Sequence, residues 1–423
     1  MSNHKQLRLE AAMNAALNKR RSNSTLRQHT SNPPTSVDFS SNDFLSLSTS
    51  QDLRNAFIDE LARHPNFTLG SGGSRLLDGN STYAEDLETS IAAFHNAPAG
   101  LLCNSGFDAN VGIFSCLPQS GDIIIYDEYI HASVHDGMRA SRASKLLPFA
   151  HNNVDSFTAA LKATISSDPL VRNGNRNIFI ALEAIYSMDG DICPLAAILA
   201  AVTHHLPHGN GHLILDEAHS TGFLGPRGRG LVSSLHLESR ILIRLHTFGK
   251  ALSSTGAVIL CSDTVKQYLI NYARPLIYTT FMTFPNLASI KASYSLLMDG
   301  TTDVLARRLC GHIRLFHALL LQLQATLTVD ARERKVLKIA DECPLSPIFS
   351  VETNAPRVLA KWCQDDGFIV RPIMPPTVPV GAERVRVCLH AGNTEKEIRA
   401  LAARIGEWCL AQTGVAVSGQ PKL

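Results

Sequence analysis

Short apolar runs that recur along the middle of the chain constrain its fold more than any other feature. They are rich in isoleucine, leucine and valine, and they lie at residues 123–126, 178–182, 213–215, 241–243 and 258–260. Longer stretches with helical spacing separate them. Alternation of this kind is typical of a mostly parallel sheet with helices on both faces. The sequence therefore predicts an α/β fold from about residue 100 to 262.

Polar segments follow the first four runs, at the points where the strands are expected to end. They contain Asp127, Glu128 and His131; Glu183, Ser187 and Asp189; Asp216 and His219; and Thr247 and Lys250. Ligands of open α/β sheets bind beyond the carboxyl ends of the strands. We therefore expect a site at this edge that contains acids, imidazoles and an amine.

A second, smaller α+β domain is expected after the sheet. The pattern at about 284–297 is helical, and strand-like segments follow at 348–351 and 384–388. The length of 423 residues allows two or three domains. We expect an N-terminal helix and segment at 1–48, a large domain at 49–290, a small domain at 291–412 and a flexible tail at 413–423.

Composition narrows the class of partner. The chain has 39 Lys and Arg against 37 Asp and Glu, 45% hydrophobic and 18% charged residues, and nine scattered cysteines without a C-x-x-C pair. The near-neutral charge disfavours nucleic acid as a partner, and no apolar run is long enough for a membrane helix. The cysteine pattern fits a reducing compartment. The His204, His205, His208 and His212 group lies among Pro and Gly residues that prevent helical alignment, so no metal site is expected.

Lys250 is the residue on which the expected chemistry depends. A lysine in a short turn is usually a solvated side chain, and Asp216 alone could be a helix cap. Here Thr247 and Gly249 precede the lysine, and Asp216 and His219 follow a neighbouring strand. An amine able to form a Schiff base, with an acid for a pyridinium nitrogen, is what pyridoxal phosphate (PLP) requires.

A phosphate group of such a cofactor needs backbone donors. The apolar run at 100–103 is followed by Ser105, Gly106 and Phe107, where a helix is expected to begin. Free amides and the helix dipole would point at one spot. Most such turns bind nothing, but together with Thr247 and Lys250 this one predicts a phosphate site.

The ordered motifs of the chain resemble those of the α-oxoamine synthases. They are G-S-G-G-S-R at 70–75, S-G-F at 105–107, H-A-S at 131–133, S-M-D-G-D at 187–191, D-E-A-H-S-T-G at 216–222 and T-F-G-K at 247–250. The resemblance covers about residues 13–410. It implies the PLP-dependent transferase fold of aspartate aminotransferase, with a large domain on a mainly parallel seven-stranded sheet. Such enzymes condense an amino acid with an acyl-CoA and release carbon dioxide.

Within that family the chain is most similar to members that join L-alanine to a pimeloyl thioester in biotin synthesis. The segments that carry this narrower resemblance are 41–45, 70–75, 149–152, 276–280 and 375–379. Small-molecule substrates, L-alanine and an acyl-CoA, are therefore expected. The resemblance also implies a homodimer with active sites shared between subunits.

The resemblance assigns cofactor roles residue by residue. Lys250 would hold the cofactor covalently and then take the α-proton of the amino acid. Asp216 would keep the ring nitrogen protonated, His131 would stack on the ring, and His219 with Ser187 would hold its phenolic oxygen. The phosphate contacts would be Ser105, Gly106, Phe107 and Thr247, with Thr279 and Thr280 from the partner subunit.

Substrate contacts are implied in the same way. Asn42 and Arg386 would hold the amino-acid carboxylate, which suits a forked guanidinium. Ser74 and Arg27 are further substrate candidates, Arg27 for the acyl-chain end. The chain departs from the family by placing Ser253 where glycine is usual after the lysine, and Met374 where bacterial relatives tend to have arginine.

Other functions remain open at this point. A relative could use glycine, serine or a carrier-bound acyl chain, an aminotransferase could share the fold, and a non-catalytic partner subunit could share the motifs. The last three residues, Pro421, Lys422 and Leu423, resemble the S-K-L signal of peroxisomal import. We therefore expect a peroxisomal or cytoplasmic protein, with an import receptor as a possible partner.

Overall fold

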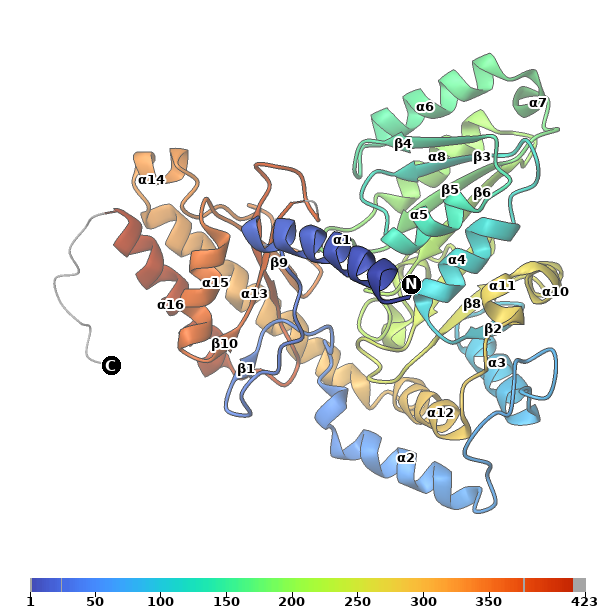
Figure 1. The fold of residues 1–423 in the computed structure, drawn as a ribbon, viewed down its shortest axis with the longest axis horizontal. Helices are drawn as coiled ribbons and strands as arrows, with labels where there is room; N and C mark the ends of the chain where they lie inside the picture. The colour runs from blue at the N-terminus through green and yellow to red at the C-terminus, as the bar shows by residue number, and fades with distance from the viewer. Residues whose placement is uncertain (1, 24, 376, 414–423) are drawn as a thin grey trace. The chain divides into compact units, whose positions relative to one another are not determined.

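The computed structural model describes residues 2–23, 25–375 and 377–413 (Figure 1). The described chain divides into two compact units, Met1–Ser36 and Val37–Leu423. The first unit holds helix α1 (Ser2–Ser22). The expected flexible tail and its last three residues lie outside the described residues, apart from Thr413 at the end of the last helix. The domain boundaries expected from the sequence stay a prediction.

The second unit contains the expected sheet. Its seven strands lie in the order β2-β8-β7-β6-β5-β3-β4, and only β8 runs antiparallel to its neighbours. The strands are β2 (Ala99–Cys103), β3 (Ile123–Asp127), β4 (Lys145–Phe149), β5 (Ile178–Glu183), β6 (Gly211–Asp216), β7 (Ile243–Thr247) and β8 (Ala257–Cys261). The predicted α/β class with a mainly parallel seven-stranded sheet is confirmed.

Both faces of the sheet are apolar because helices cover both. On β5, Ile178, Ile180 and Leu182 pack in one cluster with α6 (Val154–Ser167) and α8 (Leu195–His205). Phe179 and Ala181 pack in another cluster with α4 (Gly106–Cys116) and α5 (Ala132–Arg139). Successive strand residues point to opposite faces, so a strand covered on both sides reads as a continuous apolar run. This arrangement is why the apolar runs predicted the sheet.

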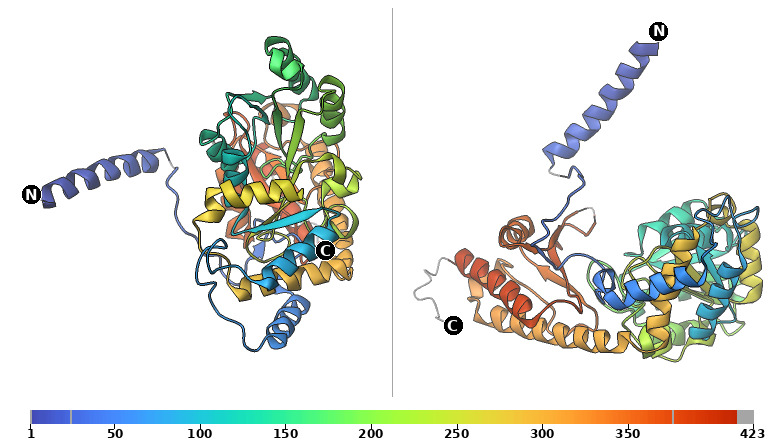
Figure 2. Two further views of the ribbon diagram at one scale, coloured as in Figure 1. Left: turned by 90° about the vertical axis from the view of Figure 1, so that its right-hand side faces the viewer. Right: turned by 90° about the horizontal axis from the view of Figure 1, so that it is seen from below.

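Helices surround this sheet and lead out of it (Figures 1 and 2). They are α2 (Gln51–Arg63), α3 (Thr82–Phe94), α4 (Gly106–Cys116), α5 (Ala132–Arg139), α6 (Val154–Ser167), α7 (Pro169–Arg172), α8 (Leu195–His205), α9 (Leu231–Ser234), α10 (Asp263–Tyr272), α11 (Arg274–Ile277) and α12 (Phe284–Met298). Short 3-10 turns lie at η1 (Leu47–Thr49), η2 (Pro226–Gly228) and η3 (Glu238–Arg240). Among the helices of the described chain, none is long and apolar enough to cross a membrane.

A smaller α+β layer follows α12. Its antiparallel sheet has the order β11-β12-β9, with β9 (Ile348–Glu352), β11 (Arg371–Ile373) and β12 (Arg384–Cys388). The helices are α13 (Thr302–Thr326), α14 (Val329–Glu333), α15 (Pro356–Asp365) and α16 (Glu395–Thr413), and a short pair joins β1 (Val37–Asp38) to β10 (Phe368–Ile369). The right-hand view of Figure 2 shows α13 and α16 side by side below the strands of this sheet.

Strand β7 differs from the prediction. The apolar run at 241–243 predicted a strand there, but β7 spans Ile243–Thr247 and so includes two buried polar residues. The Arg244 guanidinium donates to the carbonyl oxygen of His95 at 2.8 Å, and the His246 ring is paired with the Thr221 hydroxyl at 2.9 Å. These internal partners satisfy polar groups inside a strand, which hid it from an apolar pattern. Strands β4 and β11 had no counterpart among the predicted runs.

Candidate active site

A cleft of about 490 Å³ opens at the carboxyl ends of the parallel strands. Glu183, Asp216 and Thr247 are the last residues of β5, β6 and β7, and Lys250 follows β7. The lining residues are Asn104, Ser105, Gly106, Phe107, Asn110, His131, Glu183, Asp216, Ala218, His219, Thr247, Gly249, Lys250, Ser254, Thr255 and Gly256. Most of the residues to which the sequence assigned a cofactor role therefore meet in one place.

The first turn of α4 forms one wall of the cleft. The Ser105 hydroxyl caps the helix by accepting the N–H of Asp108 at 3.0 Å, so the amides of Gly106 and Phe107 remain at the exposed helix start. A Cβ at Gly106 would lie 2.5 Å from Thr247 Cγ2. Glycine therefore lets α4 approach the end of β7, and the wall presents backbone donors beside a hydroxyl.

Asp216 is held in a fixed orientation at the base of the cleft. Its Oδ2 accepts from Asn110 Nδ2 at 2.9 Å, and its Oδ1 accepts the N–H of Ala218 at 2.9 Å. The residue is 9% exposed. A carboxylate fixed by two donors can face a protonated ring nitrogen without reorienting.

Lys250 lies half-buried in the same cleft. Burial lowers the pKa of its amine, while the carboxylates of Asp216 and Glu183 oppose this shift and the Arg386 charge adds to it. A lowered pKa increases the neutral fraction of the amine near neutral pH. A neutral amine is the form that attacks an aldehyde and the form that accepts a proton.

Two histidines flank the lysine in different environments. His131 caps α5, with its Nδ1 accepting the N–H of Ser133, and its ring is exposed to the cleft. His219 is 5% exposed, and its Nδ1 has no hydrogen-bond partner among the described residues. Burial, together with the charges of Lys250 and Arg386, holds the pKa of His219 well below its usual range. His219 is therefore a neutral imidazole.

Asn110 lines the cleft although the sequence assigned it no place there, and Glu183, expected among the acids at this edge, had no specific role. Burial, reinforced by the Asp216 carboxylate, raises the pKa of Glu183 well above its usual range. Its position directly after the apolar run at 178–182 was the signal available in the sequence. Asn110 was less visible, because one polar residue on a buried face of α4 gives no pattern.

Arg386 and Asn42 are brought together as the resemblance implied. The Arg386 Nη2 donates to Asn42 Oδ1 at 2.8 Å, and its Nε donates to the carbonyl oxygen of Ser187 at 2.6 Å. Arg386 is on β12 of the smaller layer and is 8% exposed. Its influence on the pKa values of Lys250 and His219 places its charge within electrostatic reach of both.

Like Asn42 and Arg386, the remaining candidates are not among the residues that line the cleft. Ser187 contributes its carbonyl oxygen to Arg386, and the Ser74 carbonyl oxygen accepts the N–H groups of Leu77 and Gly79. Thr279 lines a separate small hollow, and the Thr280 carbonyl oxygen accepts from Asn104 Nδ2 at 2.6 Å. Arg27 belongs to the first compact unit. The roles implied for these residues stay predictions.

The residues present fit PLP. Two buried polar atoms in the cleft, His219 Nδ1 and Thr247 Oγ1, have no partner among the described residues. Buried polar groups are normally hydrogen-bonded, so both atoms are available to a bound ligand. Thr247 and the α4 amides would hold the phosphate, His219 the phenolic oxygen, Asp216 the ring nitrogen and His131 the ring face. Lys250 is the amine for the aldehyde.

Comparison with known proteins identifies the family of this chain. The profile of the family described as aminotransferase class I and II matches residues 34–405. The chain belongs to this family of PLP-dependent enzymes, and within it to the α-oxoamine synthases. It is 53% identical to an 8-amino-7-oxononanoate synthase of Emericella nidulans, over 95% of this chain and 96% of that protein.

The chain is also similar to two other proteins, one compared by sequence and one by structure. It is 40% identical to the aminoacyl transferase sphA of Aspergillus fumigatus, over 92% of this chain and 85% of that protein. A serine palmitoyltransferase of S. paucimobilis, solved with a bound PLP–myriocin aldimine, matches with a TM-score of 0.78 and 25% identity, over 90% and 89% of the two chains. The fold and the cofactor class therefore agree with the expectation.

Proposed function

We propose that this enzyme condenses L-alanine with a pimeloyl thioester, giving 8-amino-7-oxononanoate, coenzyme A and carbon dioxide in biotin synthesis. One observation carries the proposal. This protein is 53% identical to an 8-amino-7-oxononanoate synthase, and its fold brings four residues together in a single cleft, namely Lys250, Asp216, His131 and His219. The narrower choice of substrates rests on that identity, and the reaction type rests on the cleft.

Bound PLP supplies an electron sink that stabilises negative charge at the α-carbon of the amino acid. Lys250 would hold the cofactor and, as a neutral amine, would accept the α-proton of the amino acid. Its lowered pKa favours that form. Asp216, fixed by Asn110 and Ala218, would keep a proton on the ring nitrogen of the bound cofactor.

Arg386 and Asn42 would position the carboxylate of L-alanine. Two guanidinium nitrogens of Arg386 already donate hydrogen bonds, to Asn42 and to the Ser187 carbonyl oxygen. These bonds restrict the rotation of the guanidinium group. A carboxylate held there orients the α-carbon substituents relative to the base. After the new carbon–carbon bond forms and coenzyme A leaves, that carboxylate departs as carbon dioxide, and a proton returns to the carbon.

The reaction is tested with purified protein, PLP, L-alanine and pimeloyl-CoA. We expect coenzyme A and carbon dioxide in equal amounts and one aminoketone product by mass spectrometry. Lys250→Ala should give none and should lack the visible cofactor absorbance that borohydride abolishes in the parent. Keto acid formation without coenzyme A release would instead indicate an aminotransferase.

A second candidate function keeps the reaction type and changes the substrates. The 40% identity to the aminoacyl transferase sphA favours it. Glycine or serine, or a carrier-bound acyl chain, would then replace alanine and pimeloyl-CoA. A panel of these amino acids with several thioesters separates the candidates by the pair with the highest kcat/KM.

We also propose a homodimer in which each chain completes its partner's cleft. Thr279 and Thr280 do not line the cleft of their own chain, and neighbouring apolar side chains are exposed, with Tyr278 at 71% and Leu77 at 79%. Segments 70–75 and 278–281 are also tied together, because the Phe281 N–H donates to the Gly73 carbonyl.

Shared sites are tested by mixing two inactive chains, Lys250→Ala and Thr280→Ala. If each cleft uses Lys250 from one chain and Thr280 from the other, a mixed dimer holds one intact cleft and one doubly altered cleft. Random pairing should then restore up to about a quarter of the parent activity. No recovery in mixed dimers would contradict shared sites.

Peroxisomal import is proposed from the last three residues. Pro421, Lys422 and Leu423 keep the basic and leucine positions of the S-K-L signal. A fluorescent protein placed before the intact tail should become punctate and co-localise with a peroxisomal marker. The same fusion lacking Lys422 and Leu423 should remain diffuse, and a diffuse signal from both would assign the enzyme to the cytoplasm.

A further inference from the structure

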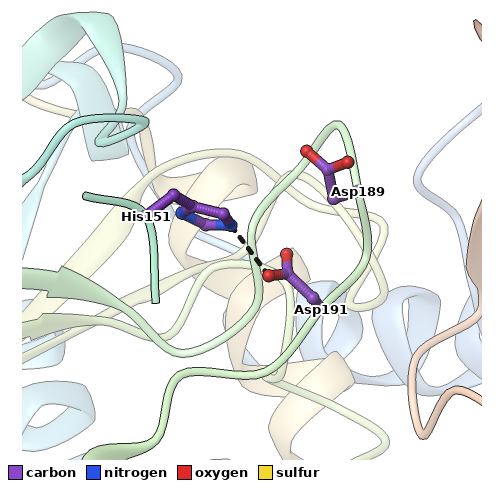
Figure 3. A group of neighbouring side chains, drawn as sticks. All are labelled: His151, Asp189 and Asp191. Carbon is purple, nitrogen blue, oxygen red and sulfur yellow. Dashed lines mark hydrogen bonds and ion pairs between the residues drawn. The ribbon is translucent and has the colours of Figure 1, made fainter. Parts of the chain in front are cut away.

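His151, outside the cleft, is held by carboxylates on both sides of its ring. It lies between β4 and α6, and its Nδ1 is 2.8 Å from Asp127 Oδ1. Its Nε2 is 2.7 Å from Asp191 Oδ2, and this contact is drawn in Figure 3. Tyr129 stacks on the ring with centroids 4.5 Å apart, and Tyr186 meets it edge-on. We call His151, Asp127 and Asp191 the His151 bridge.

The geometry of the bridge fits a protonated imidazole better than a metal ligand. Burial alone would lower the pKa of His151, but the hydrogen bonds to Asp127 and Asp191 outweigh it and raise the pKa to about 9. Both ring nitrogens therefore carry protons near neutral pH. Asp189, the third residue of the group in Figure 3, is ion-paired with Arg384. A stacked tyrosine face also favours a cation over a neutral ring.

The bridge holds one side of the loop at residues 185–192. This loop closes on itself, because the Tyr186 N–H donates to the Asp191 carbonyl at 3.1 Å and the Gly190 N–H donates to the Tyr186 carbonyl at 2.8 Å. Asn152 adds a contact to the Asp191 carboxylate and is itself fixed by its N–H on Asp127. The loop is thereby joined to the carboxyl ends of β3 and β4.

The other side of the same loop contacts β12. Arg384 pairs with Asp189, and the Arg386 Nε donates to the carbonyl oxygen of Ser187. Arg386 then reaches Asn42 with its other branch. The loop therefore connects His151 to Arg386, the residue proposed to bind the substrate carboxylate.

We infer that His151 is a positioning residue for Arg386: it fixes the 185–192 loop, whose Ser187 carbonyl oxygen orients the guanidinium toward the amino-acid carboxylate. His151 does not line the cleft and touches no reacting atom. Its loss should loosen the loop and weaken amino-acid binding, while the residues that hold PLP remain in place. The inference rests on the proposed function only for the role of Arg386.

The first test needs neither cofactor nor substrate. Hydrogen–deuterium exchange of His151→Gln should be at least about tenfold faster at Tyr186, Gly190 and Cys193 than in the parent, because a charge-assisted hydrogen bond is lost. His204→Gln removes a histidine exposed on α8 and is the matched control, with unchanged exchange in this loop. Asp191→Asn leaves the histidine and loosens the same contact, so it should show the same pattern.

The second test measures binding. Titration of the PLP-bound protein with L-alanine, followed by the change in visible absorbance, should give a Kd about tenfold higher in His151→Gln. The absorbance before titration and the Kd for PLP should match the parent. In turnover, KM for the amino acid should rise by about the same factor while kcat falls less than about twofold.

Three results would overturn the inference: unchanged exchange in the loop, an unchanged amino-acid Kd, or equal loss of PLP and amino-acid affinity. If His151→Gln does not fold, Asp191→Asn is measured by the same criteria. Failure of the proposed function gives a different result. In that case the parent itself releases no coenzyme A with alanine and pimeloyl-CoA. The role of His151 can still be tested by hydrogen–deuterium exchange in the loop, and by the binding of any amino acid that changes the visible absorbance of the PLP-bound protein.

Discussion

Ser253 occupies a backbone conformation that normally favours glycine. Its φ is 48°, in the left-handed region, which costs a residue with a side chain about 1–2 kcal/mol. Its hydroxyl donates to Asp43 Oδ1 at 2.6 Å, and Asp43 also accepts the N–H groups of Leu47 and Ser48. This hydrogen bond ties the turn after Lys250 to the segment that carries Asn42, and it gives the serine a partner in a conformation that favours glycine.

Substitution of Ser253 separates the cost of its backbone strain from the gain of its hydrogen bond to Asp43. Ser253→Ala should lower the free energy of unfolding by about 2 kcal/mol, because it removes a hydrogen bond to a charged acceptor and keeps the strain. Ser253→Gly also removes the bond but relieves the strain, so it should be more stable than the alanine variant by about 1 kcal/mol. Urea denaturation of both variants measures this. A glycine variant less stable than the alanine variant would contradict the explanation.

The His151 bridge predicts a pH dependence of stability. The pKa of His151 is raised from 6.5 to about 9, so the stabilisation is complete below about pH 6.5 and is lost as the pH rises through 9. The groups that face the ring are Asp127 from β3, Asp191 from the loop, Tyr129 and Tyr186. The Glu128 carboxylate accepts the backbone N–H of His151.

The measurement compares the parent with His151→Gln in urea at about pH 7 and about pH 10, on either side of the raised pKa. The parent should be the more stable protein at the lower pH, and the difference between the two should shrink at the higher pH. A difference that stays constant across this range would mean that the imidazole is neutral in the folded protein.

At the scale of elements, the start of α4 and the end of β7 form the phosphate side of the cleft. Their close approach depends on Gly106, because a Cβ there would collide with Thr247. The α4 amides and the Thr247 hydroxyl then face the same volume. The helix N-terminus supplies the dipole, and β7 supplies the hydroxyl.

Gly106→Ala should push α4 away from β7 and raise the Kd for PLP at least about tenfold, as expected when an anion loses a charge-assisted donor. Gly311→Ala is the matched control, since Gly311 lies inside α13 and a Cβ added there would meet no atom within 4 Å. It should leave the Kd for PLP unchanged and stabilise the protein by about 1 kcal/mol. Equal Kd values for both variants would show that the close approach is unnecessary.

Strands that are apolar along their length could be predicted from the sequence. Strands β3, β5, β6 and β8, and the polar residues that follow or end the first three, were found because double-sided burial leaves a continuous apolar run. The same pattern failed at β7, where Arg244 and His246 are satisfied by distant partners, and at β4, whose residues are largely exposed.

The site also contains some residues that the sequence could predict and others that it could not. Lys250, Asp216 and His219 were found from their positions after strands and from motif order. Asn110 was missed because its partner Asp216 is 106 residues away, and the Ser253–Asp43 contact spans 210 residues. Such contacts depend on the packing of the whole chain, which no local pattern reports.

At the scale of the whole molecule, the site draws on distant parts of the sequence. Lys250 follows a strand of the large sheet, Arg386 is on β12, and Asn42 lies between β1 and α2. Cofactor binding and substrate binding should therefore be separable. Arg386→Lys should raise the Kd for L-alanine about tenfold or more, because a forked donor is lost, and should leave the PLP absorbance unchanged. Loss of both together would place Arg386 in the cofactor site instead.

Turnover with defined substrates tests the central claim most directly. Purified protein with PLP, L-alanine and pimeloyl-CoA is followed for coenzyme A, carbon dioxide and product mass, beside Lys250→Ala. We predict equal release of coenzyme A and carbon dioxide, with 8-amino-7-oxononanoate as product, from the parent alone. Absence of coenzyme A release from a parent that carries its full complement of PLP would contradict the proposed condensation.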